Sequence, residues 1–525
     1  MKYRRQLRGA AMQSAEAFAA SWRGIGTSHR VRPATLALGG ALLMALMLRV
    51  AAFRSQIYVI YPDETFQYLE QAHRLAFGSG VVPWEYFVGV RSWLVPGVLA
   101  GLFRVASWFT DSPLAFVQLA RFGCSVVSLA VVFVGFRLAE RHFGTWAAML
   151  TGGLCAVWGE LIWFAPTVMP EVLSAHFALL ALWCGESGRR RSLLLTGFGL
   201  GLAACLRFQY APALFAAALW QHRLDWQRWR LVLCGGAAAI LPVAGLLDWV
   251  TLGTPFQSIW LNYIVNSKDG VASSMGTVAA WFFPSYLSVA FSPVALLVPL
   301  VVVGAFRAPA LAITATVVVA LHSLVPHKEI RFIYLATAVM PILIGLGAAE
   351  VLHRLARQRL RQIAWPATAI LLVGAAALSW QTAFTGVMAP RWQYHRATIE
   401  AVLAAHAAPD LCGLASRDEL TIGSAGYAYL HRDVPLILGY LPPERHLPGS
   451  DLPMRSAIIL DGRPVPQVPS GQLTENAKRF NYLLAEDGDT EPGYAVVGCF
   501  DDVARTLDGR RALCLLKRPG GCALP

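Results

Sequence analysis

Two short clusters of ionisable residues stand next to long apolar runs. Asp63 and Glu64 follow the first apolar run, and His327-Lys328-Glu329-Ile330-Arg331 separates two later ones. Ionisable groups this close to hydrocarbon are costly, which makes function their default interpretation. A carboxylate can take the proton of a hydroxyl group, and Lys and Arg bind phosphate. Together the clusters predict a site that deprotonates one substrate and binds a lipid phosphate headgroup of another.

Asp63 and Glu64 are adjacent, so on a helix they point in different directions. Carboxylates favour the first turn of a helix through its dipole, and Pro62 also suits a helix start. A helix start and a catalytic role are compatible, because the start would aim Asp63 at an approaching substrate. We expect Asp63 to be the general base and Glu64 to support it.

The second cluster could be a solvated turn, but ordinary turns favour Gly, Asn and Ser instead. We expect His327, Lys328 and Arg331 to bind the donor phosphate and Glu329 to hold one of these cations in place. Arg207, which interrupts another apolar run, is equally consistent with a further phosphate ligand and with a side chain that snorkels to the interface.

Other polar residues fall at the ends of apolar runs on the same expected side of the membrane. Asp248 precedes a turn, so it could cap that turn or contact substrate. Glu171 belongs to this group without an assigned role. Supporting or substrate-binding roles are expected for Glu85, Arg91, Asp248, Asn262 and Asn266.

The composition places these residues in a bilayer. The chain of 525 residues is 56% hydrophobic and 14% charged, whereas soluble domains carry about 25% charged residues. A spanning helix needs roughly 20 apolar residues, and about eleven spans are predicted when the run broken by Arg207 counts as a hairpin of two. The predicted spans are 35–53, 114–138, 145–160, 167–185, 192–220, 231–250, 278–304, 309–326, 332–350 and 363–386.

The loops between these spans alternate in charge, and the arginine-rich ones all fall on one side, which is expected to be cytoplasmic. Residues 1–34 form a basic cytoplasmic tail and residues 35–388 a catalytic membrane domain. Its first outer loop covers 54–113, within which 91–110 are expected to lie in the outer interface. Short apolar runs among Pro and Gly turns predict a small soluble α/β domain for 389–525 on the outer side.

Two other classes of function are disfavoured. The net charge of +13 could suggest nucleic acid, but the basic runs are short and separated by apolar spans. The nine cysteines show no zinc-site spacing. Those in the C-terminal region could form disulfides if that region is extracytoplasmic, namely Cys412, Cys499, Cys514 and Cys522.

The motifs of residues 36–345 resemble those of the Alg9/PIG-B-type mannosyltransferases, glycosyltransferase family 22 of the GT-C superfamily. His327–Phe332 is similar to the family's HKExRF signature, and further similarity lies in the first outer loop and in a later loop. One departure is the second outer loop, where Pro166-Thr167-Val168-Met169-Pro170-Glu171 replaces the family's Arg-Thr and Asn. The matching segments are Tyr61–Tyr68, Gly78–Gly80, Trp84–Tyr86, Arg91–Pro96, Asp248–Trp249, Gly253 and Trp260–Asn266.

The resemblance implies a GT-C membrane bundle with its active site on the periplasmic or lumenal face. It implies transfer of a hexose, mannose in this family, from a polyprenyl- or dolichyl-phosphate donor to a glycan or glycolipid hydroxyl, with inversion. Asp63 would serve as base, and Lys328, Arg331 and Arg207 or His327 would stabilise the departing phosphate. A cationic phosphate site could replace a metal, so neither metal nor cofactor is expected.

Two alternatives remain open. One is a GT-C transferase for another polyprenyl-phosphate sugar, and the other is a lipid or solute transporter. Transporters often show internal repeats and charges near the midplane, whereas this chain shows no repeat and collects its charges on one face. The expected location is a bacterial inner membrane with a periplasmic site, or alternatively the endoplasmic-reticulum membrane.

Overall fold

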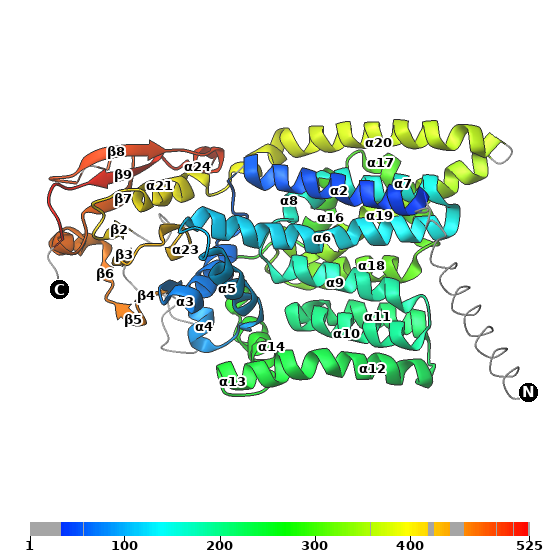
Figure 1. Cartoon of the computed structure of the whole chain (residues 1–525), viewed down its shortest axis with the longest axis horizontal. Coiled ribbons are helices and arrows are strands. Elements are labelled where there is room, and N and C mark those ends of the chain that lie inside the picture. Colours follow the sequence, from blue (N-terminus) through cyan, green and yellow to red (C-terminus); the bar gives the residue numbers. More distant parts are fainter. Residues whose placement is uncertain are drawn as a thin grey trace, which may run out of the picture.

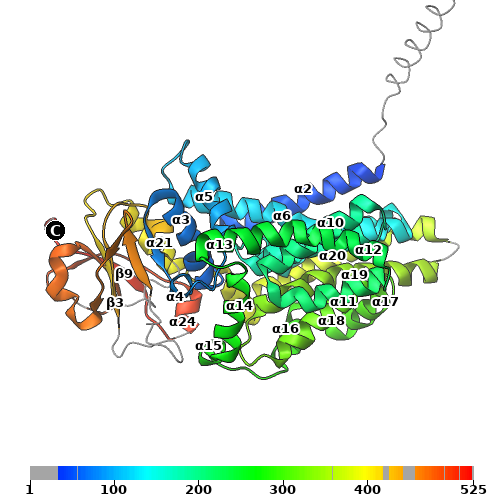
Figure 2. The ribbon, with the colours of Figure 1, turned by 90° about the horizontal axis from the view of Figure 1, so that it is seen from below.

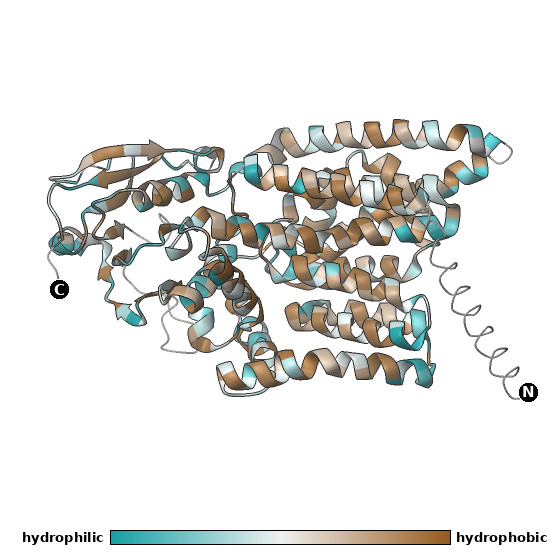
Figure 3. Ribbon diagram, viewed as in Figure 1, coloured by the Kyte–Doolittle hydropathy of each residue, from teal (hydrophilic) through white to brown (hydrophobic). Residues whose placement is uncertain are grey.

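The computed structural model describes residues 33–522 apart from 56, 357–358, 418–424, 441–455, 490 and 508. A bundle of apolar helices lies at one end of the molecule and a sheet-containing domain at the other (Figures 1 and 3). The bundle helices are α2 Pro33–Ser55, α6 Pro113–Phe143, α7 Thr145–Val157, α8 Gly159–Phe164, α9 Pro170–Gly185, α10 Arg190–Leu206, α11 Ala211–His222, α12 Trp226–Ile240, α13 Asp248–Leu252, α14 Gln257–Tyr263, α15 Val271–Ser274, α16 Phe282–Ala290, α17 Val294–Ala305, α18 Pro309–Leu324, α19 Tyr334–Ala356 and α20 Leu360–Phe384.

Within the described residues, five helices are long and apolar enough to cross a membrane: Pro33–Ser55, Pro113–Phe143, Trp226–Leu252, Ile330–Ala356 and Gln362–Phe384. The bent pair α16 and α17 would add a sixth span, and α5 (Leu94–Ala106), α7, α9 and α18 are shorter apolar helices. The chain is therefore a multi-pass α-helical membrane protein, as predicted. The count of about eleven spans stays a prediction.

The centre of the bundle is α19, which packs against α6, α7, α9, α17, α18 and α20. Close approach of α17 and α19 depends on glycine. A Cβ on Gly304 would lie 2.0 Å from the carbonyl oxygen of Leu343, and one on Gly347 would lie 2.0 Å from that of Leu300. Small residues at such crossings let helix backbones pack closely in lipid, where hydrophobic association between helices is weak.

Two predicted features of the bundle have different outcomes. The hairpin over 192–220 is confirmed, because α10 and α11 are separate helices joined by a short turn that begins at Arg207. The span over 278–304 stays a prediction, because this segment forms two helices, α16 and α17, which are long and apolar enough for a span only together and meet at an angle of 100°. The break falls at Ser292-Pro293, where proline removes a backbone donor and disfavours the helical conformation of the residue before it.

The first loop folds into short elements: a π-helix Glu64–Leu69 that continues into α3 Glu70–Phe77, then β1 Gly80–Val82, α4 Trp84–Val88 and α5 Leu94–Ala106. Helix α5, which covers much of the predicted interfacial segment, packs against α3 and α6. The helical stretch begins at Pro62, which confirms the predicted helix start. The end of the bundle that carries this loop is called the loop end below.

The C-terminal region forms a mixed six-stranded sheet in the order β6-β3-β2-β7-β9-β8, which confirms an α/β module. It lies beside the first loop in both views (Figures 1 and 2). Its elements are α21 Arg396–His406, β2 Leu414–Ser416, α23 Tyr427–Leu430, β3 Leu436–Tyr440, β4 Ala457–Leu460, β5 Arg463–Val465, β6 Val468–Pro469, β7 Tyr482–Glu486, β8 Ala495–Phe500, α24 Val503–Leu507 and β9 Leu513–Lys517.

The C-terminal module and the first loop share backbone and side-chain contacts. Strand β1 pairs with β4 in antiparallel register. The buried carboxylate of Glu70 accepts hydrogen bonds at 2.7 Å from the backbone N–H groups of Val81 and Ala428. His73 bridges the two parts as well, with Nε2 2.8 Å from Nδ1 of His431. These contacts fix the module directly beside the loop that carries Asp63.

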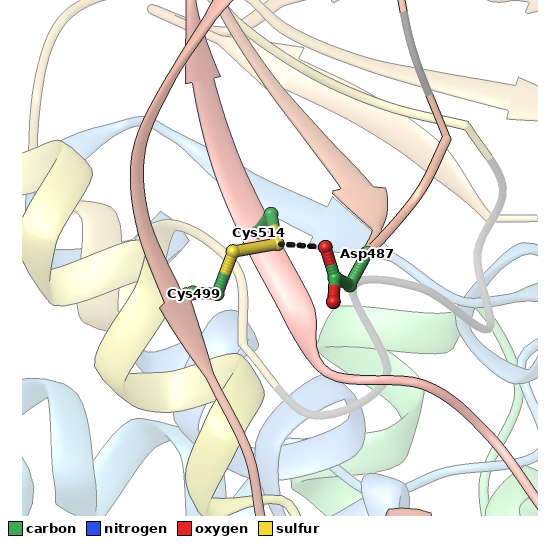
Figure 4. Close-up of side chains that lie close together, drawn as sticks. All are labelled: Asp487, Cys499 and Cys514. Carbon is green, nitrogen blue, oxygen red and sulfur yellow. Dashed lines mark hydrogen bonds between the residues drawn. A yellow bond between two sulfur atoms is a disulfide. The ribbon is translucent and has the colours of Figure 1, made fainter.

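Two disulfides form in the C-terminal module, Cys412–Cys522 and Cys499–Cys514. Asp487 lies next to the second, with a carboxylate oxygen 3.8 Å from Sγ of Cys514 (Figure 4). A disulfide sulfur carries no proton to donate and no thiolate to ligate a metal. The grouping of Asp487 with the two cysteines is therefore a contact around a cross-link.

Candidate functional site

Four separate segments converge at the loop end of the bundle. Asp63 lies at the start of the first-loop helix and Glu171 in the first turn of α9. Arg207 lies between α10 and α11, and the loop 325–329 leads from α18 into a short 3₁₀ helix that begins α19. Each side chain sits where a helix begins or ends, which brings charged groups to the edge of the apolar bundle.

Arg331 is the centre of this group. Its Nη2 donates to Oδ2 of Asp63 at 2.5 Å, although the two residues are 268 positions apart. Its Nε forms ion pairs with Oε2 of Glu329 at 2.5 Å and with Oε1 of Glu171 at 3.8 Å. The guanidinium also lies over the ring of Tyr61, 4.5 Å from its centroid. The two clusters named first in the sequence thus form one site.

Arg207 extends the site. Its Nη1 lies 3.0 Å from Oε1 of Glu171, and its guanidinium lies 4.7 Å from the ring centroid of Phe332. The side chain is only 10% exposed. Of the two interpretations left open, snorkelling to the interface does not fit a buried, ion-paired arginine. A ligand for phosphate fits, and that role stays a proposal.

His327 and Glu329 form a second pair within the site. Nδ1 of His327 lies 3.1 Å from the carbonyl oxygen of Gly276, and Nε2 lies 3.0 Å from Oε1 of Glu329. Burial would raise the pKa of Glu329, but Arg331 and His327 outweigh it and lower that pKa to about 2. The hydrogen bond to Glu329 raises the pKa of His327 above its ordinary value, against the effect of burial. Both ring nitrogens face acceptors, so the imidazolium is favoured.

The pair predicts how stability depends on pH. Because the folded-state pKa of His327 is raised, its contribution is complete below the ordinary pKa of about 6.5 and is lost as the pH rises through the raised value. Thermal unfolding of the wild type is expected to weaken over this range, and His327→Gln should remove that part of the loss. His353→Gln, at an exposed histidine of α19, is the control. Identical pH profiles for wild type and His327→Gln would refute the pairing.

Lys328 does not join the cluster. Its Nζ donates to the backbone carbonyls of Val278 at 2.8 Å and Val325 at 2.5 Å, and the residue is 6% exposed. The expected phosphate-binding role of Lys328 therefore stays a prediction, and its described partners are backbone carbonyls. Lys328 instead holds the chain that precedes α16 against the loop 325–329.

Glu64 lies on the other side of its helix from Asp63. It is fully buried, its Oε1 accepts from the backbone N–H of Val168 at 3.2 Å, and that oxygen lies 3.7 Å from Nη2 of Arg121. It therefore fastens the start of the loop helix to the segment before α9. A supporting role for Glu64 would be exerted through this positioning.

Glu85 and Arg91 approach the cluster from the far part of the first loop. Oε1 of Glu85 accepts from Nε2 of Gln67 at 2.7 Å, and burial raises the pKa of this carboxyl to about 7 despite the opposing effect of Arg91. Arg91 interacts electrostatically with Glu85, Asp63 and Glu171. Its Nε is buried and donates no hydrogen bond within the described chain, so Arg91 retains a donor for a ligand.

A small pocket of about 50 Å³ lies beside the cluster and is lined by Arg91, Arg207 and Asn262 together with other polar and apolar side chains. Asn262 donates to the carbonyl of Val90 at 3.1 Å, and Asn266 donates to Asn262. These asparagines order the pocket wall.

Asp248 lies within its helical span instead of ending it. Its Oδ2 accepts from both the backbone N–H and the hydroxyl of Ser258, at 2.9 and 2.6 Å. Ser258 is in the first turn of α14 and also lines the pocket. Asp248 therefore secures the start of α14, which is the capping interpretation.

Glu171 is a member of the cluster for which no role is predicted from the sequence. It bonds to Arg207 and also approaches Arg331, and its side chain is 4% exposed. A signal for it exists in the sequence: Pro170-Glu171 begins a helix on the same side as Pro62-Asp63, and both carboxylates are in first turns. Met169 is a further neighbour, its sulfur 3.9 Å from Nη1 of Arg331.

Solved structures of low sequence identity share this fold. ArnT from Cupriavidus metallidurans bound to undecaprenyl phosphate superimposes with a TM-score of 0.59 at 14% identity, covering 92% of this chain and 98% of ArnT. The Archaeoglobus fulgidus oligosaccharyltransferase superimposes with a TM-score of 0.51 at 13% identity, and the match covers 86% of this chain and 68% of the oligosaccharyltransferase chain. The chain therefore shares its overall fold with these two proteins.

Two relatives found by sequence similarity are named as mannosyltransferases. GPI mannosyltransferase 3 of Drosophila melanogaster is 26% identical over 364 residues, covering 64% of this chain and 60% of the relative. GPI alpha-1,2-mannosyltransferase 3 of Mus musculus is 26% identical over 314 residues, covering 55% of each. The chain thus spans about three fifths of the length of the relatives it matches. The profile of the Alg9-like mannosyltransferase family matches residues 41–391, which contain every residue of the cluster. This chain therefore belongs to the Alg9-like mannosyltransferase family.

Proposed function

We propose that the protein transfers mannose from a polyprenyl- or dolichyl-phosphate donor to a hydroxyl of a glycan or glycolipid, with inversion at the anomeric carbon. The observation that carries this proposal is the direct pairing of Asp63 with Arg331 at the loop end of the bundle. A candidate base and a candidate phosphate ligand touch, beside a pocket lined by two further arginines. The family and the fold agree with such a reaction.

Asp63 would be the general base. Its Oδ2 is bonded to Arg331, whereas Oδ1 makes no hydrogen bond to the described residues, and the side chain is 31% exposed. Oδ1 would accept the proton of the acceptor hydroxyl as that oxygen forms its bond to the anomeric carbon. The bond from this carbon to the phosphate oxygen breaks on the opposite face, and its electron pair leaves with the lipid phosphate.

The leaving phosphate needs positive charge. Arg331 can supply it from the cluster, and Arg207 and Arg91 can supply it from the pocket wall. Guanidinium groups held in place before the reaction stabilise developing charge without reorganisation. His327 would act through Glu329, which it holds against Arg331. We assign Lys328 a positioning role, in accordance with its two carbonyl partners.

The carboxylates of the cluster are paired with arginines, which favours a metal-free mechanism in which guanidinium groups take the part of a cation. The test is transfer by the purified full-length protein from polyprenyl-phosphate mannose to candidate glycan and glycolipid acceptors, with products identified by mass. We expect full activity after EDTA treatment. A strict need for Mn²⁺ or Mg²⁺ would contradict the metal-free mechanism, and transfer of only another polyprenyl-phosphate sugar would replace mannose in the proposal.

We further propose that the loop end faces the periplasm or the endoplasmic-reticulum lumen, with the C-terminal module on that side. The two disulfides support this placement, because disulfides persist in oxidising compartments. The arginine-rich turns at the opposite ends of the helices support it too, since basic loops favour the cytoplasm. Of the two membranes, we favour a bacterial inner membrane.

A further inference from the structure

A second, larger cavity lies at the end of the bundle opposite the candidate site. Three helices show the separation, because α9, α11 and α18 each have one end next to the cluster and the other end at this cavity. Helices of 12 to 16 residues at about 1.5 Å per residue put roughly 20 Å between the two sites. The cavity has a volume of about 390 Å³.

The wall of this cavity is strongly basic. Four arginines line it, against one carboxylate, Glu186; the arginines are Arg141, Arg223, Arg228 and Arg307. Three of them have acidic partners: Arg141 pairs with Glu186 at 2.8 Å, Arg228 with Asp225 at 3.2 Å and Arg307 with Glu350 at 2.6 Å.

The acidic partners leave positive charge uncompensated. Glu350 is shared, because it also binds Arg354 at 2.5 Å. Arg223 makes no ion pair with any residue in the described part of the chain. Gln221 also lines the cavity, and its Oε1 accepts no hydrogen bond from described residues. The cavity thus offers cations for an anion and an acceptor for a hydroxyl.

Apart from His142 and Gln221, the remaining wall is apolar. Leu138, Leu182 and Leu311 line the cavity from three different helices, and Trp183 and Trp220 stand with them. Tryptophan is enriched at the level of lipid headgroups. A basic mouth over apolar walls, at the end of membrane helices, matches the division of a phospholipid into headgroup and acyl chain. If the arginines served only to orient this end of the bundle in the membrane, their charge would be explained, but not their position around a cavity with apolar walls.

We propose that this cavity binds the headgroup of an anionic glycerophospholipid, at a site distinct from the donor site. Arg223 and Arg228 contact the phosphate, the carbonyl oxygen of Gln221 accepts from a headgroup hydroxyl, and the apolar wall receives the upper part of an acyl chain. The bound lipid fills the space between α6, α9, α11 and α18. The other ends of α9, α11 and α18 position Glu171, Arg207 and the loop 325–329.

Native mass spectrometry of the full-length protein, titrated with phosphatidylglycerol or phosphatidylcholine, tests the proposal. Arg223→Gln/Arg228→Gln should weaken binding of the first phosphatidylglycerol by about tenfold, because each lost phosphate contact removes a charge-assisted hydrogen bond. Arg190→Gln/Arg191→Gln removes the same charge from exposed positions at the same end and should change it less than twofold. Both double variants should keep the melting temperature of the wild type.

Three outcomes would overturn the proposal. Equal weakening by the two double variants would mean a diffuse basic surface. Equal binding of phosphatidylcholine would remove the role of negative charge. Displacement of the lipid by inorganic phosphate at millimolar concentration would assign the cavity to free phosphate.

Discussion

Replacing Asp63 with asparagine is expected to slow sugar transfer by at least about 100-fold, which is the lower range for loss of a general base. The amide keeps the size of the carboxylate but cannot take a proton from the acceptor hydroxyl. Arg331 keeps Glu329 and Glu171 as partners in this variant, so the cluster stays paired and the fold should persist. Turnover under saturating donor and acceptor is the measurement, because the lost group acts in the chemical step.

Two further variants serve as controls for this experiment. Asp63→Glu restores a carboxylate one methylene further out and should recover part of the activity. Asp111→Asn removes an exposed carboxylate from the same loop and should leave turnover unchanged. Turnover of Asp63→Asn within tenfold of the wild type would exclude Asp63 as the base and direct attention to Glu171, the other carboxylate that approaches Arg331.

Some residues of this site can be predicted from the sequence and others cannot, because the direction of a side chain can depend on its neighbours in the folded structure. Asp63 and Arg331 are predictable because an ionisable residue at the end of an apolar run has few structural explanations. Lys328 is not, because the chain bends at 325–327 and has extended backbone angles at Glu329, so the direction of each side chain depends on the local backbone. Lys328 consequently faces carbonyls while its neighbours face each other. A linear motif contains no information about these directions until the backbone is known.

Contacts between residues far apart in the sequence explain the other features of the structure that the sequence does not predict. Glu171 acquires its role from Arg207 and Arg331, which lie in separate helical hairpins, so its own surroundings in the sequence look like an ordinary helix start. The pairing of β1 with β4 joins residues almost 380 positions apart, and a three-residue strand has no recognisable pattern. The fold class can be predicted from the sequence because many apolar runs and many basic loops along the chain all contribute to the same signal. The docking of the C-terminal module depends instead on single contacts, such as those of Glu70.

Arg331 and Asp63 should affect donor binding in opposite directions. In the structure Asp63 occupies Nη2 of Arg331, so a phosphate that binds there competes with the carboxylate. Asp63→Asn removes a competing anion and should bind polyprenyl phosphate at least as tightly as the wild type. Arg331→Lys keeps the charge that Glu329 and Glu171 require but loses the planar, bidentate donor. It should bind polyprenyl phosphate about tenfold more weakly and slow transfer by about 100-fold or more.

The double variant Asp63→Asn/Arg331→Lys tests whether Asp63 and Arg331 act together when the donor phosphate binds. If donor phosphate displaces Asp63 from Arg331, the effects of Asp63→Asn and Arg331→Lys on polyprenyl phosphate affinity will not be additive, as expected for residues in direct contact. Binding of polyprenyl phosphate to the four proteins, followed by calorimetry, measures the coupling. Arg190→Lys, at an exposed position at the opposite end of the bundle, is the control and should not change the affinity. Additive effects, or weaker binding by Asp63→Asn, would contradict the exchange. A coupled pair would mean that the base is released only when a donor has arrived, so that an empty site holds no activated carboxylate.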